Sequence, residues 1–212
     1  MNKIGITFAT ILLNLFLCDA IIAGEEKQPK SEKITALHPV KQVLEPHDRN
    51  IAIKVQNDGE QIIVDANFLV PVVAQQAWAV LTDFDNMHKF STGVLSSKIT
   101  GGSGNNLHVS QKRISRYGFF TFSLDSIREI NLIPFAKIHE RMISGSMRKM
   151  EETTQLLPEG DQTRITYRVV FIPGSWIPPV AGEVFIKQEA REQLQEVVNE
   201  IIRRKQTKLA NQ

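Results

Sequence analysis

The chain has 212 residues, and its 25 lysines and arginines nearly balance its 23 aspartates and glutamates, which leaves a net charge of +2. A charge this close to zero gives no electrostatic reason to expect a nucleic acid as partner. The only cysteine, Cys18, lies in an N-terminal apolar run, so the rest of the chain has neither a disulfide nor a thiol nucleophile.

The first residues have the layout of a secretory signal peptide. Lys3 supplies a positive charge, an almost wholly apolar run extends from Ile4 to Cys18, and cleavage could follow Ala20 or Ala23. The apolar run is shorter than the about 20 residues that span a membrane. We therefore predict a signal peptide over residues 1–23 and an exported, periplasmic protein. The alternative is an uncleaved N-terminal segment that anchors the chain to the membrane.

Two further segments follow this signal. Residues 24–48 are polar and contain three prolines, which predicts a linker or N-terminal arm. The patterned part of the chain begins near Asn50, so we predict one folded domain over residues 49–212. This length is sufficient for a single hydrophobic core.

The domain is predicted to open with a hairpin and a broken helix. Residues 51–56 and 61–70 read as two strands joined by a turn at Asn57-Asp58-Gly59. Residues 73–81 then show helical spacing, and the polar run 83–86 interrupts it before one more short turn. Asp83 or Asp85 is expected to cap that second turn through a side-chain oxygen.

Strand patterns dominate from residue 93 to residue 172, separated by hairpin-length turns such as the glycine-rich 101–106. Period two places Phe120, Phe122 and Leu124 on one face of their strand. It does the same for four residues of the strand 163–172, which are Ile165, Tyr167, Val169 and Phe171. The carboxylates of Glu140, Glu151 and Glu152 are expected to face solvent.

A long amphipathic helix is predicted at the end of the chain, because apolar residues recur there at spacings of three and four. They are Ile186, Ala190, Leu194, Val197, Val198, Ile201 and Ile202. The order of elements predicts an α+β fold, in which a curved antiparallel sheet of about seven strands wraps around this helix. We expect the helix to leave a cavity against the sheet.

Two stretches of the chain resemble the START-like, or SRPBCC, superfamily, and within it the polyketide cyclase/dehydrase and coenzyme Q-binding branch. The first stretch carries the residues Trp78, Leu81, Thr82, Asp83, Phe84 and Phe90. The second carries Gly160, Thr163 and Tyr167, and the likeness covers about residues 50–207. The resemblance implies the helix-grip fold and a ligand that is a lipid, an isoprenoid quinone or a polyketide-like molecule.

We expect this ligand to bind in the cavity without being changed chemically, and we expect no cofactor. The residues predicted to bind it are Phe84, Met87, Phe90, Phe120, Phe122, Leu124, Ile165, Tyr167, Val169, Phe171, Leu194 and Val198. For the first three, which lie near the expected mouth, packing inside the core is the equal alternative. Basic residues gather on two strands and at the end of the helix, where they could make transient contact with a membrane, although an ordinary solvated surface is the favoured interpretation.

The alternative function is an enzyme of the polyketide cyclase or dehydratase type. Its polar groups would come from Tyr167, His108, Gln111 and Arg113, although the sequence shows no compelling acid–base pair. The five histidines do not stand in a metal-ligand spacing, so no metal site is predicted. Ser103 and Ser146 lie in predicted turns rather than in a nucleophile elbow.

Overall fold

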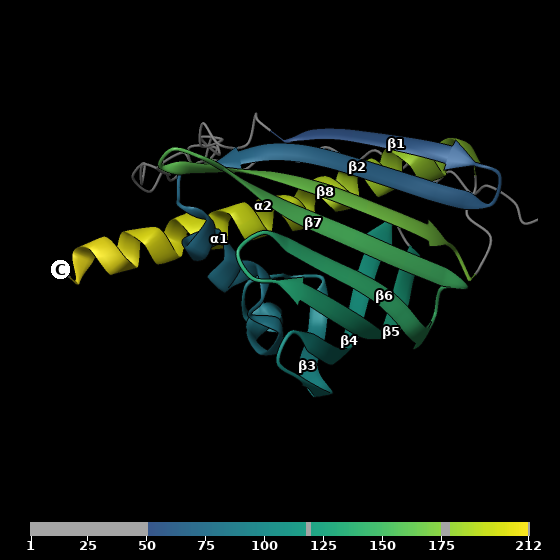
Figure 1. Cartoon of the computed structure of the whole chain (residues 1–212). Helices are drawn as coiled ribbons and strands as arrows, with labels where there is room; N and C mark the ends of the chain where they lie inside the picture. The colour runs from purple at the N-terminus through teal and green to yellow at the C-terminus, as the bar shows by residue number, and fades with distance from the viewer. Residues whose placement is uncertain (1–50, 118–119, 175–178, 212) are drawn as a thin grey trace, which may run out of the picture. The chain divides into compact units, whose positions relative to one another are not determined.

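The computed structural model describes residues 51–117, 120–174 and 179–211, and for Tyr117, Phe120 and 179–181 only the backbone. The predicted signal peptide and arm therefore lie outside the described residues. Within the described part the chain forms one antiparallel sheet and three helical segments, which Figure 1 shows. None of these helices is long and apolar enough to cross a membrane.

The sheet has eight strands rather than about seven, and its spatial order is β1-β2-β8-β7-β6-β5-β4-β3. The strands are β1 (Ala52–Asp58), β2 (Gln61–Val70), β3 (Val94–Ser103), β4 (Asn106–Tyr117), β5 (Phe120–Ile133), β6 (Lys137–Gly145), β7 (Lys149–Glu159) and β8 (Gln162–Ile172). The helical segments are α1 (Ala74–Leu81), the 3-10 helix η2 (Phe84–Lys89) and α2 (Pro179–Ala210). The α+β fold with a long C-terminal helix against an antiparallel sheet is thus confirmed.

Helix α2 packs on one face of the sheet, which we call the inner face; the opposite face is the outer face. Ile186 and Ala190 of α2 contact a buried cluster that includes Val64 of β2 and Val169 of β8. Leu194 of α2 belongs to the main core, together with residues of β2, α1 and β8. In Figure 1 the yellow helix accordingly runs behind β1, β2 and β8. The helix contacts β1, β2 and α1 much more than it contacts β3 to β6.

The period-two prediction for β8 is confirmed by the strand register. Ile165 and Val169 are buried on the inner face, whereas Arg168 points outward and pairs with Asp65 of β2. Tyr167 packs against both core clusters on the inner side. Alternate residues of the neighbouring strands follow the same rule, because directly opposed residues of an antiparallel pair share a face.

The polar break between α1 and η2 is real, but the predicted side-chain cap is wrong. No side-chain hydrogen bond caps η2. The carboxylate of Asp83 instead accepts from Asn86 Nδ2 at 2.7 Å and from Arg204 of α2 at 2.7 Å. Asp85 accepts a hydrogen bond from the backbone N–H of Ile99 at 2.8 Å. Both carboxylates therefore tie η2 to other elements instead of ending its own backbone.

Polar contacts at two places along α2 hold the helix in position. Near its middle, Glu196 accepts hydrogen bonds from the Ser91 hydroxyl at 2.8 Å and from the Thr92 backbone N–H at 3.1 Å. Near its end, Lys205 donates to the Pro71 carbonyl at 2.6 Å and Arg204 donates to the Ala79 carbonyl at 3.3 Å. The helix is thus fixed to α1 and to the segment that follows η2.

Replacing Thr163 by valine should destabilise the domain by about 1 to 2 kcal/mol. The Thr163 hydroxyl is fully buried and donates to the Val72 carbonyl at 2.8 Å, just before α1 begins. Valine keeps the shape of the side chain but leaves that carbonyl without its donor. Urea unfolding measures the loss, with Thr166→Val as control because the Thr166 hydroxyl makes only an exposed 3.4 Å contact. Equal losses in both variants would contradict this account.

Candidate functional site

Five polar side chains gather on the inner face, one from each of five neighbouring strands. Arg113 lies on β4, Arg128 on β5, Glu140 on β6, Glu152 on β7 and Tyr167 on β8. We call these five residues the inner polar cluster. Glu140 and Glu152 are directly opposed in the β6–β7 register, so both carboxylates leave the same face of the sheet.

Two direct contacts link four members of the cluster. Arg128 Nη1 donates to Glu140 Oε2 at 2.5 Å, and these two side chains are only 7% and 6% exposed. The Tyr167 hydroxyl donates to Glu152 Oε2 at 3.0 Å. A buried ion pair adds little stability unless the remaining donors of its arginine are also hydrogen-bonded. The energetics of the cluster therefore depend on the contacts of the other guanidinium nitrogens.

Three of those nitrogens have no partner among the described residues. They are Nη2 of Arg113 and Nε and Nη2 of Arg128, and all three are buried. Buried donors are nearly always hydrogen-bonded in folded proteins, because an unpaired one costs about 1 to 3 kcal/mol. The inner polar cluster therefore has more donors than the described residues supply acceptors for.

Burial controls the charges of the cluster. Burial in the first place, and then the carboxylate of Glu140, raises the pKa of Glu152 to about 7, although Arg128 acts in the opposite direction. Burial also raises the pKa of Tyr167, helped by the neighbouring Glu152, and lowers the pKa of Arg113, helped by Arg128. Near neutral pH the Glu152 carboxyl group is thus partly protonated and offsets the charge of the two arginines only in part.

The members of the cluster do not all have the same access to solvent. Arg128 and Glu140 are buried. Arg113, Glu152 and Tyr167 are surrounded by protein atoms, but part of each side chain remains accessible to solvent. A water-sized molecule can therefore reach part of each of these three side chains. The three residues therefore combine a low-dielectric environment with access for a small polar group.

An accessible apolar surface continues from the cluster along β5. Phe122 lies on the inner face, opposite Ser115 of β4, and is 42% exposed. Its ring is 6.1 Å from that of Phe185 on α2. Leu124 follows on the same face and is half-buried. This strip is a part of the inner face that stays accessible to solvent.

The predicted ligand-binding residues fall into two groups. Phe84, Ile165, Val169, Leu194 and Val198 are buried and form parts of the packed core clusters. Half-buried or exposed positions are taken by Met87, Phe90, Phe122, Leu124, Tyr167 and Phe171. The side chain of Phe120 lies outside the described residues. Only the second group has surface to offer a ligand, so the role of the first group as a ligand wall stays a prediction.

The expectation for the glutamates was wrong in part. Glu140 and Glu152 turn inward, and only Glu151 lies on the outer face, 3.6 Å from His139. The signal was in the sequence, because Glu140 lies between Ile138 and Met142 at period two. Among the polar groups considered for an enzyme, Tyr167, Gln111 and Arg113 are on the inner face, whereas His108 is exposed on the outer one.

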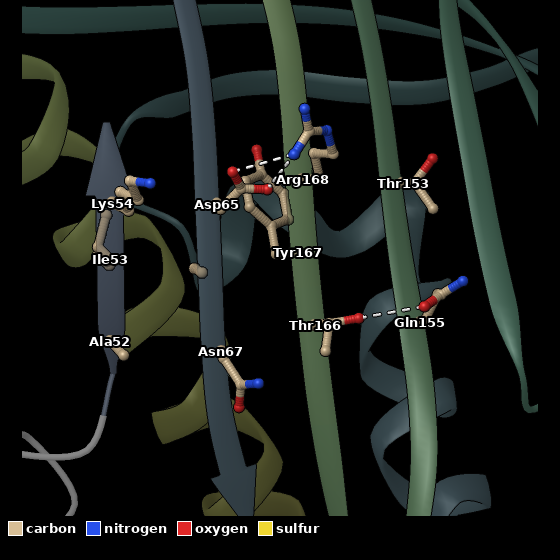
Figure 2. A pocket seen from close by; sticks show the side chains of 11 residues that line it. Ala52, Ile53, Lys54, Asp65, Asn67, Thr153, Gln155, Thr166, Tyr167 and Arg168 are labelled. Carbon is tan, nitrogen blue, oxygen red and sulfur yellow. Dashed lines mark hydrogen bonds and ion pairs between the residues drawn. The ribbon is translucent and has the colours of Figure 1, made fainter. Parts of the chain in front are cut away.

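An open depression of about 630 Å³ lies on the outer face, across β1, β2, β8 and β7. Figure 2 views it with α2 behind the strands and shows the Asp65–Arg168 ion pair and the contact between Thr166 and Gln155 at its surface. The depression is open to solvent, so an apolar molecule bound there would keep much of its surface in water. We therefore do not take it as the site of a hydrophobic ligand.

A smaller depression of about 180 Å³ lies between α2 and the start of β3, and it is lined mainly by polar groups of α2 and β4, among them Arg116 and Glu189. Gly93 also lines it, and a side chain at this position would come within 3.6 Å of Arg113 Nη2. The depression therefore lies next to the inner polar cluster. Among the residues that the structure describes, no group of three histidine, cysteine, aspartate or glutamate side chains could hold a metal ion.

Comparison with known proteins agrees with the fold. A STAR-related lipid transfer protein of Xanthomonas axonopodis superposes with a TM-score of 0.62 at 12% identity, covering 72% of this chain and 94% of that one. The Zhui aromatase/cyclase of Streptomyces sp. R1128 gives 0.58 at 14% identity, covering 68% and 95%. The protein TTHA0849 of Thermus thermophilus gives 0.57 at 15% identity, covering 66% and 97%. Identities this low show the fold alone.

Comparison with the curated proteins gave no significant match. The sequence model of one family matches residues 70–198, from the end of β2 through most of α2. This match covers more than half of the chain and includes the whole inner polar cluster. The chain therefore belongs to the family described as polyketide cyclase / dehydrase and lipid transport.

Proposed function

We propose that the domain binds and carries a hydrophobic small molecule on its inner face, between α2 and strands β4 to β6, without changing it chemically. The observation that carries this proposal is the exposure of Phe122, which is 42% exposed on the inner face of β5. An aromatic side chain held open to water beside a second aromatic ring, that of Phe185, gives an apolar guest a surface to cover.

Membership of a family described by lipid transport supports a carrier, and so does the fold shared with a protein named as a lipid transfer protein. Binding would be driven by burial, at roughly 0.8 kcal/mol for each methylene group moved out of water. A lipid, an isoprenoid quinone or a polyketide-like molecule would each provide enough apolar surface.

The test is a calorimetric titration with 1-octanol, 1-nonanol and 1-decanol. Burial predicts that affinity rises about fourfold for each added methylene. Phe122→Ser should weaken 1-decanol binding about tenfold, because about 1.4 kcal/mol of apolar contact is lost. Ile127→Ser is the matched control, since Ile127 is 43% exposed on the outer face of the same strand. An affinity that is independent of chain length, or equal effects of both substitutions, would overturn the proposal.

A second candidate function is an enzyme of the polyketide cyclase or dehydratase type. The observation that favours it is the hydrogen-bonded pair of Tyr167 and Glu152, because a carboxyl group with a pKa of about 7 can both donate and accept a proton near neutral pH. Native mass spectrometry of the purified protein with its bound molecule separates the two functions. A carrier leaves the mass of the ligand unchanged over time, whereas a dehydrating cyclase removes the mass of one water, and Tyr167→Phe stops that loss.

The N-terminal assignment remains part of the proposal. Residues 1–23 would direct export to the periplasm, residues 24–48 would form an arm, and the ligand-binding domain would follow. The mass of the mature chain, purified after expression of the full sequence, tests this directly. Cleavage after Ala20 or Ala23 supports export, and an intact N-terminus supports the membrane-anchored alternative.

A further inference from the structure

We propose that the ligand carries a carboxylate at one end of its apolar body, and that Arg128 and Arg113 bind this carboxylate on the inner face. The inference rests on the proposed function and adds the polar half of the ligand to it. Its basis is the set of guanidinium nitrogens for which the described residues supply no acceptor.

Arg128 presents one complete edge of its guanidinium group. Nη1 is used by Glu140, while Nε and Nη2 are buried without a partner among the described residues. Nε–H and one Nη2–H point in parallel along the same side of the planar group, and this pair matches the two oxygens of a carboxylate. The unpaired donors are therefore not scattered single atoms but one bidentate binding edge. The contact with Glu140 holds the side chain so that this edge keeps its direction.

Arg113 supplies a second cation, and it makes fewer hydrogen bonds than Arg128. It makes no hydrogen bond or ion pair with the described residues, and its Nη2 is buried. The carboxylate of Glu152 is close enough to act on its charge but accepts its hydrogen bond from Tyr167 instead. Glu189 of α2 also acts on Arg113 only through space. An incoming acceptor thus meets no competing hydrogen bond at Arg113.

The charges of the inner polar cluster also suit an anion. Two guanidinium groups are balanced by Glu140 and, incompletely, by Glu152, whose pKa of about 7 leaves it partly neutral. One further negative charge brings the buried site close to neutrality, which lowers the cost of keeping both arginines away from water. A further cation brought to this site would have the opposite effect. The site therefore favours anionic ligands over cationic ones.

The apolar strip fixes where the rest of the ligand lies. Arg128, Leu124 and Phe122 project from the same face of β5, and the first and last of them are about six residues apart. At about 3.3 Å per residue this is a span of roughly 20 Å. A carboxylate at Arg128 would therefore place an extended chain beside Leu124 and direct its end toward Phe122. The polar and the apolar contacts form one continuous site.

Decanoate and 1-decanol differ in the group that the arginines would recognise and share their chain length, so they are the probes for the test. Calorimetry at neutral pH should show decanoate binding at least tenfold more tightly than 1-decanol. A purely apolar site predicts the reverse, because the ionised group is harder to remove from water. Arg113→Gln should lower the ratio of decanoate affinity to 1-decanol affinity at least fivefold.

Lys112→Gln is the matched control, since Lys112 is exposed on the outer face of the same strand and its loss should leave the preference intact. Because Arg128 alone cannot be removed without leaving Glu140 unpaired, its role is tested in the double variant Arg128→Gln with Glu140→Gln, where the preference for decanoate should vanish. Equal binding of the two probes, or an unchanged preference in Arg113→Gln, overturns this inference and leaves the proposed function intact. Failure of both probes to bind overturns both.

Discussion

Replacing Glu140 by glutamine is expected to destabilise the domain by about 3 to 5 kcal/mol, the loss typical of breaking a buried ion pair. Glu140 and Arg128 are 6% and 7% exposed, and their contact is the direct compensation for the Arg128 charge. Without that carboxylate, Arg128 and Arg113 would share the inner face with only the partly protonated Glu152. Urea unfolding at neutral pH measures the loss.

The sheet contains a matched control for this experiment. Glu129 and Arg141 also join β5 to β6, at 2.6 Å, but their side chains are 33% and 61% exposed. Glu129→Gln should cost less than about 1 kcal/mol, as exposed pairs do. The double variant Arg128→Met with Glu140→Met should recover most of the loss, because it removes both buried charges together. If Glu140→Gln cost no more than Glu129→Gln, the cluster would not be a buried, charged site.

Raising the pH from 5 to 8 is expected to lower the free energy of unfolding by up to about 3 kcal/mol through Glu152 alone. Its pKa is about 7 in the folded protein, compared with an ordinary value of 4.5. Between these two values the folded state keeps a proton that the unfolded state releases, so each rise in pH favours the unfolded state. By about pH 8, one unit above the folded pKa, Glu152 is ionised in both states and the loss is nearly complete. Thermal unfolding across this range measures the slope.

Glutamine at position 152 cannot ionise, so Glu152→Gln should remove the part of the pH dependence of stability that Glu152 causes. The stability of this variant, compared with that of the native chain, should therefore be higher at pH 8 than at pH 5. Glu60→Gln serves as control, because Glu60 is 70% exposed and pairs only with the exposed Arg148. Subtracting the native profile from each variant profile cancels the other titrating groups. A difference profile for Glu152→Gln that is as flat as that of Glu60→Gln would show that Glu152 titrates normally.

Local patterns were sufficient to predict most of the fold. The alternation of Ile165, Tyr167 and Val169 predicted both the strand β8 and the face that these side chains share. The spacing from Ile186 to Ile202 predicted α2 and its buried side. Such patterns succeed because period two and period 3.6 follow directly from backbone geometry.

The inner polar cluster could not be predicted in the same way, because it depends on the register between strands. Arg113 and Tyr167 are 54 residues apart in the sequence, and only the order of five strands brings them onto one site. A carboxylate on a strand is usually solvated, so Glu140 was predicted to face solvent. Its period-two position between apolar residues indicated the inner face instead. The predicted cap by Asp83 was wrong for a related reason, since its partner Arg204 lies at the far end of the chain.

The most direct test of the account is methyl NMR of the domain during titration with 1-decanol, because it reports which face of the sheet binds the molecule. We predict that the largest shifts occur at Leu124 and Val169 of the inner face and at Ile186 of α2. Methyl groups of the outer face, such as those of Ile127, Thr153 and Thr166, should hardly move. Shifts centred on Thr153 and Thr166, around the outer depression, with an unchanged inner face would contradict the account.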